Sequence, residues 1–309
     1  MKIYRHITEI PAESRHVVTI GTFDGVHAGH RKILSRVKQL AEEQNAQSLV
    51  MTFDPHPRKV LQPDMGITLL TNTEEKLKLF DELGIDAVFI QKFDEAFANT
   101  SAQDYIEKIL VKGLKTKGLV IGYDHHFGKG RTGSLRDLIE KSMEFDYVVE
   151  EISAQDIDDV VVSSTKIRNA LKVGDVAKAA EYLTYPYSLQ AKVIEGRKLG
   201  RTIGFPTANL EFTDSEKLIP NTGVYAVKAL VDQQTYLGMM NIGYRPTVDN
   251  DKQLKAEVHM LQFNQDIYDK LLCILFIERV RDELKFDSVH KLAEQLHSDK
   301  RTVETIFGL

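Results

Sequence analysis

The chain has 309 residues, which at roughly 150 residues per domain favours two domains. Hydrophobic residues make up 42% and charged residues 28%, so the composition argues against a disordered, collagen-like or fibrous chain. The net charge of −5 argues against a general nucleic-acid or membrane-surface binder. Because no apolar run approaches the ~20 residues of a membrane helix and the first residues lack a secretory signal, we expect a cytoplasmic protein without nucleic-acid or membrane partners.

The chain contains one cysteine, Cys273, which excludes an internal disulfide and a cysteine-based zinc site. Its neighbours are apolar, so we expect a buried thiol on a strand.

The first part of the chain, to about residue 180, alternates short β-branched runs with amphipathic segments. This alternation is typical of an α/β fold in which helices cover both faces of a parallel sheet. Apolar residues recur at helical spacing in Arg31–Glu43 and Glu74–Leu83, so we predict a helix over each. The predicted strands are Val17–Ile20, Ser48–Phe53, Ala87–Ile90, Gly118–Gly122 and Tyr147–Glu150.

The second part of the chain consists of short alternating segments separated by glycine, proline and asparagine, which predicts a small antiparallel barrel. A final helix is expected from Val289 to about Leu296, with Asp287-Ser288 as its N-cap. We place the domain boundary near Thr184, which gives domains 1–184 and 185–309. The predicted strands are Gln190–Glu195, Val224–Val231, Thr235–Ile242, Leu254–Leu261 and Leu271–Arg279.

The first motif, Gly21–His30, follows a strand and opens a helix. Free backbone N–H groups and the helix dipole make such a start an anion site, and His27 and His30 lie on one helical face. Gly29 leaves room between them. The dipole supplies only ~1 kcal/mol, which is too little to hold a triphosphate, so we expect additional cationic donors or a metal.

A second cluster, Ser163–Arg168, again precedes a helix and offers hydroxyls with Lys166 and Arg168 close behind. The two helix starts could together clamp one polyphosphate. Taken alone, the histidines suit a surface and the hydroxyls suit a helix cap, but the combination favours phosphate chemistry.

The third motif, Gly196–Leu210, has glycine at every fourth position among the basic residues Arg197, Lys198 and Arg201. It lacks the Walker pattern but allows the backbone to approach phosphates closely. Thr207 and Asn209 are two residues apart, so on an extended segment their oxygens face the same way and could share one Mg²⁺ bound to ATP. A Gly-rich hairpin explains the spacing equally well.

Together these motifs resemble the bifunctional riboflavin kinase/FMN adenylyltransferases of bacteria, also called FAD synthetases, over nearly the whole chain. The resemblance implies a Rossmann-like nucleotidyltransferase domain followed by a riboflavin kinase barrel. In the first domain it rests on Gly21–His30, Phe53–Pro57, Gly122–Gly128 and Ser163–Arg168. In the second domain it rests on Pro206–Asn209, Gly223–Tyr225, Asn241–Thr247, Glu257–His259 and Arg281–Phe286.

The resemblance also implies roles for individual residues, with His27, His30, Arg168 and Glu257 as catalytic residues. Contacts to ATP in the first domain are implied for Gly21, Phe23, Asp24, Gly25, His27, His30, Ser164, Thr165 and Arg168. Flavin contacts are implied for Phe53, Pro57, Asp124 and Phe127. Contacts to ATP in the barrel are implied for Gly200, Gly204, Thr207 and Asn209, the last two as Mg²⁺ ligands. The sequence departs from the family at Thr22, which is more often Asn or Ser, and at His125, which is usually Phe.

The chemistry of the two acceptors differs. The phosphate of FMN is already largely ionised near pH 7, so its attack on ATP needs no base, and His27 and His30 are better interpreted as hydrogen-bond donors. The ribityl alcohol of riboflavin must lose a proton, which requires a base, and the family's candidate is Glu257. Alternation places Glu257 on the same strand face as His259. We expect this face to point into the barrel; on an outward face Glu257 would be an ordinary solvated charge.

We therefore expect ATP, riboflavin and FMN as partners, with conversion of riboflavin to FMN and of FMN to FAD and pyrophosphate. Two alternatives remain. Another H-x-G-H nucleotidyltransferase, acting on pantetheine phosphate or nicotinamide mononucleotide, would leave Thr207 and Asn209 without a purpose. A flavin-binding sensor or regulator would not need both phosphate sites. The acidic segment Asp156–Asp159 is interpreted as a solvated loop.

Overall fold

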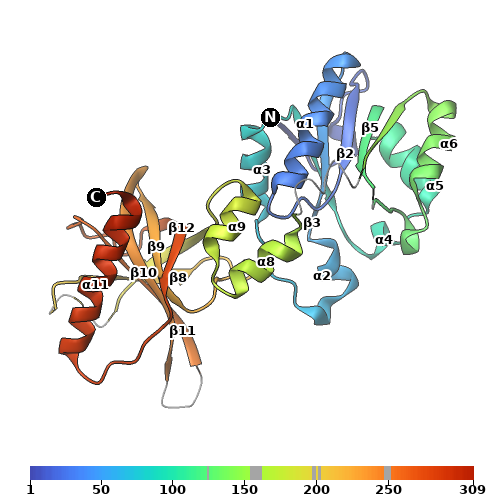
Figure 1. The fold of residues 1–309 in the computed structure, drawn as a ribbon. Coiled ribbons are helices and arrows are strands. Elements are labelled where there is room, and N and C mark those ends of the chain that lie inside the picture. Colours follow the sequence, from blue (N-terminus) through green and yellow to red (C-terminus); the bar gives the residue numbers. More distant parts are fainter. Residues whose placement is uncertain (124, 154–161, 197–199, 201–202, 247–251) are drawn as a thin grey trace. The chain divides into compact units, whose positions relative to one another are not determined.

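The computed structural model describes residues 1–123, 125–153, 162–196, 200, 203–246 and 252–309. The chain forms two compact units, Met1–Ser164 and Thr165–Leu309 (Figure 1). Within the described ranges, no helix is both long enough and apolar enough to cross a membrane. Some residues singled out in the sequence lie outside these ranges: Asp124, the acidic segment 156–159, and Arg197, Lys198 and Arg201.

The first unit is built on a six-stranded sheet with the order β1-β4-β3-β2-β5-β6, in which every neighbouring pair is parallel. All five predicted strands are present, each within two residues of the expected ends, whereas the three-residue edge strand β1 was missed. The strands are β1 (Lys2–Tyr4), β2 (His16–Ile20), β3 (Gln47–Asp54), β4 (Ala87–Lys92), β5 (Thr116–Gly122) and β6 (Val148–Ile152).

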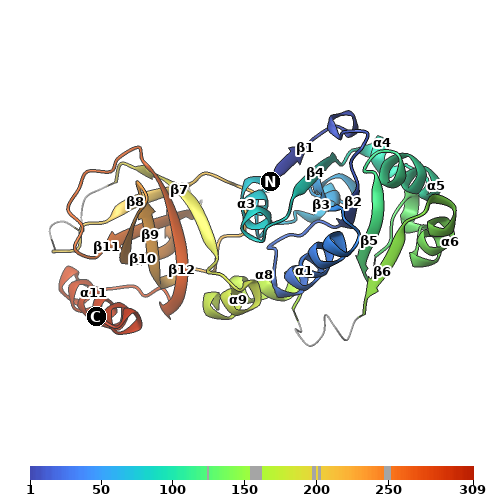
Figure 2. The same ribbon diagram turned by 90° about the horizontal axis from the view of Figure 1, so that it is seen from above.

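Helices cover both faces of this sheet, as predicted (Figure 2). One face packs against α1 (Ala28–Glu43) and α3 (Thr73–Glu82). The other packs against the π-helical η3 (Tyr105–Val111) and α6 (Leu135–Phe145). The remaining helical segments are η1 (Ile7–Glu9), α2 (Pro57–Leu61), η2 (Pro63–Met65), α4 (Glu95–Ala98), α5 (Ala102–Asp104) and η4 (Lys129–Arg131).

The strand order reverses direction at β2. The chain adds β3 and then β4 on one side of β2, and returns to add β5 and then β6 on the other side. In open parallel sheets ligands bind at such a switch point, in the crevice outside the carboxyl ends of the strands. The predicted motifs that follow β2, β3 and β5 therefore all lie at the edge of the sheet where a ligand is expected.

The second unit contains a closed six-stranded barrel with the order β10-β11-β8-β7-β12-β9, in which all pairs are antiparallel. The five predicted strands are present, and the short β8 was not predicted as a strand. Cys273 lies on β12 as expected but is only partly buried, because it alternates with the buried Leu272 and Ile274. The strands are β7 (Ser188–Ile194), β8 (Ala208–Phe212), β9 (Gly223–Val231), β10 (Gln234–Pro246), β11 (Lys252–Met260) and β12 (Leu271–Arg281).

Helix α11 (Val289–Phe307) packs on the outside of the barrel. Its N-cap is Ser288, as predicted, since the hydroxyl accepts a hydrogen bond from the backbone N–H of Lys291 at 3.2 Å. The predicted end near Leu296 is wrong. The apolar stripe continues through Val303 to Phe307, and this continuation is hidden in the sequence by the polar residues around Asp299, which is itself buried.

Two helices, α8 (Ser164–Lys172) and α9 (Val176–Leu183), precede the barrel. The carbonyl of Leu171 accepts a hydrogen bond from the N–H of Asn221 at 3.0 Å, and α9 packs against β12. Thr184 ends α9 in the left-handed conformation. The boundary near Thr184 stays a prediction for where the two functional domains meet.

Candidate functional sites

The loop between β2 and α1 has an unusual backbone. Phe23, Gly25 and Val26 have φ values of 47°, 84° and 36°. Only glycine adopts this region readily, so the loop is held by its surroundings. Asp24, which is 3% exposed, accepts hydrogen bonds from the N–H groups of Leu70 and Thr71, each at 3.0 Å. Its carboxylate therefore fixes the loop, and the implied contact of Asp24 with phosphate stays a prediction.

His27 and His30 are stacked, with ring centroids 3.6 Å apart, which confirms that they share one face of α1. His27 is the N-cap, and its Nδ1 accepts a hydrogen bond from the N–H of His30 at 3.4 Å. Burial, with smaller contributions from the charges of His27 and Lys76, holds the pKa of His30 well below its usual value. The pair therefore presents a neutral His30 imidazole, which can donate a hydrogen bond to a phosphate oxygen but is not a cation near pH 7.

A buried lysine beneath the loop was not predicted. Lys76 of α3 is 6% exposed, and its ammonium donates to the carbonyl of Thr22 at 3.3 Å and to the hydroxyl of Thr52 at 3.5 Å. Burial lowers its pKa, while the carboxylates of Asp24 and Asp54 oppose that shift. The sequence carried one indication that Lys76 is buried: it lies one helical turn before Phe80, on the apolar side of α3. Lys76 is a candidate for the additional cation that phosphate binding requires.

Ser164 is brought to the same loop, since its hydroxyl donates to the carbonyl of Asp24 at 3.0 Å. Gly21 also fits closely there, because a Cβ atom would lie 3.0 Å from the ring of Phe23. Thr165 and Arg168 belong to the second unit, where Thr165 is exposed and Arg168 is partly buried. Their contacts with ATP stay predictions.

The predicted flavin residues in the described ranges lie near the ends of two strands: Phe53 within the last residues of β3, Pro57 after β3, and Phe127 after β5. Phe53 packs edge-on against Phe93, with centroids 5.6 Å apart, and Pro57 begins α2. Phe127 is only 5% exposed and stacks on Tyr105 at 5.1 Å, so most of its ring belongs to the core of the sheet. A cavity of about 620 Å³ lies beside this region, and His125, the departure from the family, lines it together with Tyr123, His126, Ser134 and Arg136.

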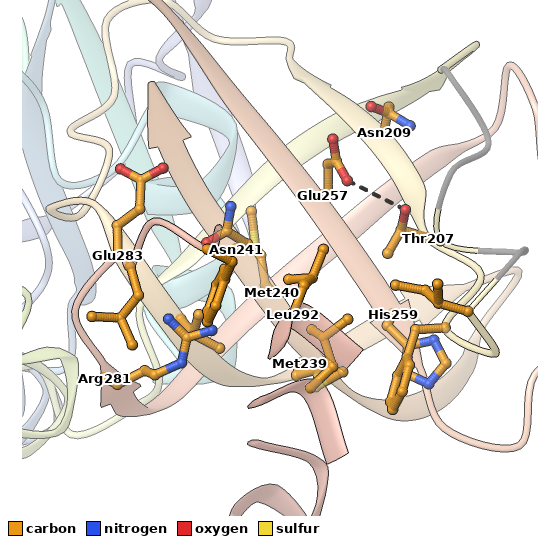
Figure 3. A pocket seen from close by; sticks show the side chains of 17 residues that line it. Thr207, Asn209, Met239, Met240, Asn241, Glu257, His259, Arg281, Glu283 and Leu292 are labelled. Carbon is orange, nitrogen blue, oxygen red and sulfur yellow. Dashed lines mark hydrogen bonds between the residues drawn. The ribbon is translucent and has the colours of Figure 1, made fainter. Parts of the chain in front are cut away.

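The second site is a cavity of about 240 Å³ on the outer face of the barrel, between β8, β10, β11 and α11 (Figure 3). The strand register places Asn209, Glu257 and Asn241 directly opposite one another on three neighbouring strands. Opposed residues of antiparallel strands share a face, so these side chains form a polar row along the cavity wall.

Glu257 and His259 lie on the same face of β11, as predicted, and alternate with the buried Ala256 and Val258. That face points out of the barrel, because Met239, the strand partner of His259, packs in the cluster beneath α11. The expectation that Glu257 faces the barrel interior is therefore wrong. Glu257 is not an ordinary solvated charge either. Residues of α11 and of the segment after β12 cover this outer face, so Glu257 lines a cavity.

Thr207 and Asn209 both line this cavity, which agrees with their predicted common orientation. The hydroxyl of Thr207 donates to Oε2 of Glu257 at 3.3 Å (Figure 3). A Cβ atom at Gly196 would lie 1.9 Å from the amide of Asn209, so glycine leaves space for that side chain. Hydroxyl, amide and carboxylate oxygens are the hard ligands that Mg²⁺ prefers, so the donor set fits this ion.

An ion pair that sequence reasoning missed anchors the wall of the cavity. Arg281 at the end of β12 binds Asp299 of α11 through three contacts, Nε to Oδ1 at 2.9 Å, Nε to Oδ2 at 3.1 Å and Nη2 to Oδ2 at 2.7 Å. Asp299 is 1% exposed and also accepts from the amide of Gln295 at 2.8 Å. Arg281 was noted only as part of a motif, and nothing in the local pattern marks Asp299 as buried.

The structure defines a class of protein with two units: a parallel sheet with a histidine-containing helix start at its switch point, and a closed antiparallel barrel with a polar pocket on its outer face. Two family models match it, FAD synthetase over residues 9–166 and riboflavin kinase over residues 183–307. The chain belongs to the bifunctional riboflavin kinase/FMN adenylyltransferase family.

Curated relatives of that name match nearly end to end. The protein of Bacillus subtilis is 39% identical over 96% of this chain and 94% of its own length. The protein of Listeria monocytogenes is 37% identical over 99% and 98%. A solved structure from Streptococcus pneumoniae, named as a macrolide-efflux protein, is 31% identical, covers 98% of both chains and has a TM-score of 0.87.

Proposed function

We propose that the chain makes FAD from riboflavin in two steps, each consuming one ATP. The barrel transfers the γ-phosphoryl group of ATP to riboflavin, which yields FMN and ADP, and the α/β unit transfers AMP from ATP to FMN, which yields FAD and pyrophosphate. The observation that carries the proposal is the contact of Thr207 with Glu257 inside a cavity whose wall carries Asn209 and Asn241. These residues supply a base and a set of cation ligands where a phosphate acceptor can bind.

In the kinase reaction the primary ribityl hydroxyl attacks the γ-phosphorus, the bond from that phosphorus to the β,γ-bridging oxygen breaks, and the hydroxyl proton is transferred to Glu257. Thr207 and Asn209 would hold Mg²⁺, which supplies charge neutralisation of the ATP phosphates when it is bound. Gly200, which lines the cavity, and Gly204 would allow the backbone to approach the ATP phosphates.

In the adenylyl transfer an ionised phosphate oxygen of FMN attacks the α-phosphorus, and the bond to the leaving pyrophosphate breaks. His27, His30 and the N–H groups at the start of α1 donate hydrogen bonds to the phosphate oxygens. Lys76 adds positive charge from beneath the loop. We also propose that both reactions take place in the cytoplasm.

The alternatives make different products. A nucleotidyltransferase for pantetheine phosphate or nicotinamide mononucleotide has no use for the barrel pocket, and a sensor binds flavin without converting it. Macrolide efflux is not proposed, because both sites offer ligands for phosphate and a hard cation. Incubation of the purified chain with riboflavin, ATP and Mg²⁺, followed by chromatographic separation of flavins, distinguishes these cases. FMN with FAD supports the proposal, FMN alone would mean an inactive first unit, and unchanged riboflavin would contradict it.

A further inference from the structure

His259 lines the pocket two residues along β11 from Glu257, beyond the polar row of Asn209, Glu257 and Asn241. It is 9% exposed, and its Nδ1 lies 2.8 Å from the carbonyl oxygen of Pro206. A carbonyl only accepts, so Nδ1 must carry the proton, and the tautomer of the ring is fixed by this contact. Phe205 packs edge-on against the imidazole, with centroids 5.2 Å apart. The ring is therefore held in place and faces Pro206.

The contact between His259 and Pro206 lies just beyond the end of the β8–β11 strand pairing. The pairing of β8 with β11 runs from Leu210 to Ala208, which is paired with Val258. Pro206 and Thr207 lie beyond that last pair, and proline has no backbone N–H with which to extend the ladder. The side chain of His259 thus makes, at Pro206, the connection between the two segments that the backbone does not make.

We propose that His259 is a positioning residue of the kinase site: its Nδ1–H holds the carbonyl of Pro206, so that the hydroxyl of Thr207 stays beside Glu257. The proposal rests on the proposed kinase function. Thr207 contacts Glu257 at 3.3 Å, and a shift of the preceding peptide would move its hydroxyl away from the carboxylate and from Asn209. Burial lowers the pKa of His259, which keeps the ring neutral near pH 7.

A series of substitutions at this position separates positioning from simple packing. In His259→Asn the amide nitrogen takes the place of Nδ1 and can still donate to Pro206. In His259→Gln the amide lies where Nε2 was, and in His259→Leu there is no donor. His290→Leu, on the exposed start of α11, is the matched control. Thermal unfolding of the whole chain shows whether the barrel of each variant is folded, and FAD formation from supplied FMN, measured on the same molecules, shows that the first unit is intact.

We expect His259→Leu and His259→Gln to lower kcat for FMN formation by about tenfold, because each variant loses one hydrogen bond that positions Thr207. Both should also raise several-fold the Mg²⁺ concentration that gives the half-maximal rate. His259→Asn should stay within about threefold of the parent chain, and none of the variants should change FAD formation from FMN. Equal rates in all variants would overturn the proposal, as would an Asn variant as impaired as the Leu variant. If Leu unfolds the barrel, the contrast of Asn with Gln decides. A parent chain that makes no FMN would refute the kinase function itself, and the positioning role with it.

Discussion

The loop after β2 and the pocket beside α11, to which we assign the two phosphate-transfer steps, are built from different parts of the protein. The loop relies on backbone N–H groups and on left-handed residues locked by Asp24 and Thr71, with the stacked histidine pair above and a buried lysine below. The pocket relies on side chains, with a carboxylate in a row of amides and a hydroxyl. The difference follows the acceptors: an ionised phosphate needs only donors, whereas an alcohol needs a base.

The strongest test of this contrast is removal of the base. Glu257→Gln should lower kcat for FMN formation by roughly 10²–10⁴-fold, because the ribityl alcohol then has no proton acceptor. Riboflavin should still bind, as measured by fluorescence titration, and FAD formation from FMN should be unchanged. The control is Glu211→Gln, because Glu211 is an exposed carboxylate on β8. Normal FMN formation in Glu257→Gln would discard the role of Glu257 as base.

The reciprocal test removes a donor from the loop. His30→Ala should reduce FAD formation by roughly 10²–10³-fold, the effect of losing one donor to a charged transition state. FMN formation by the same preparation should be normal and is the internal control. Undiminished FAD synthesis would remove His30 from the reaction.

The ion pair between Arg281 and Asp299, which anchors the wall of the pocket, is tested by the free energy of unfolding. Asp299→Asn leaves Arg281 without its buried counter-charge and should lower the free energy of unfolding by about 3 kcal/mol. Asp287→Asn, whose carboxylate is 88% exposed, should change little. Calorimetry of the whole chain measures both variants, and equal melting temperatures would show that the ion pair does not stabilise the barrel.

A smaller effect is expected beneath the loop. Lys76→Met should raise the KM for ATP in FAD formation by about tenfold, because one buried positive charge near the phosphates is lost. The matched control is Lys78→Met, since the side chain of Lys78 on the same helix is 80% exposed. If the two variants behave alike in initial-rate assays, Lys76 does not contribute to ATP binding.

The smallest effect concerns the sheet under the loop. His16 of β2 is fully buried, its Nδ1 contacts the carbonyl of Leu114 at 2.6 Å, and burial lowers its pKa. The unfolded chain takes up a proton near pH 6.5 that the folded chain binds only at lower pH, so stability falls as the pH drops below about 6.5. His16→Asn keeps the contact without the titration and should lose less stability than the parent chain between pH 7 and pH 5. Parallel denaturation curves for both proteins would contradict this.

Local sequence patterns predicted most of the fold, because buried strands and amphipathic helices have distinct periods. They failed where the decisive contact is distant. Alternation separated Glu257 from Val258 but could not show which face is inside, since that depends on where α11 packs. Lys76 and Asp299 appear as solvated charges in the sequence, and only tertiary packing buries them.

The most direct test of the central claim is the stoichiometry of complete turnover. With riboflavin, excess ATP and Mg²⁺, each FAD formed by the purified chain should be accompanied by one ADP and one pyrophosphate, with FMN accumulating first. FAD formed without ADP, or ATP consumed without either flavin product, would contradict the two-site account.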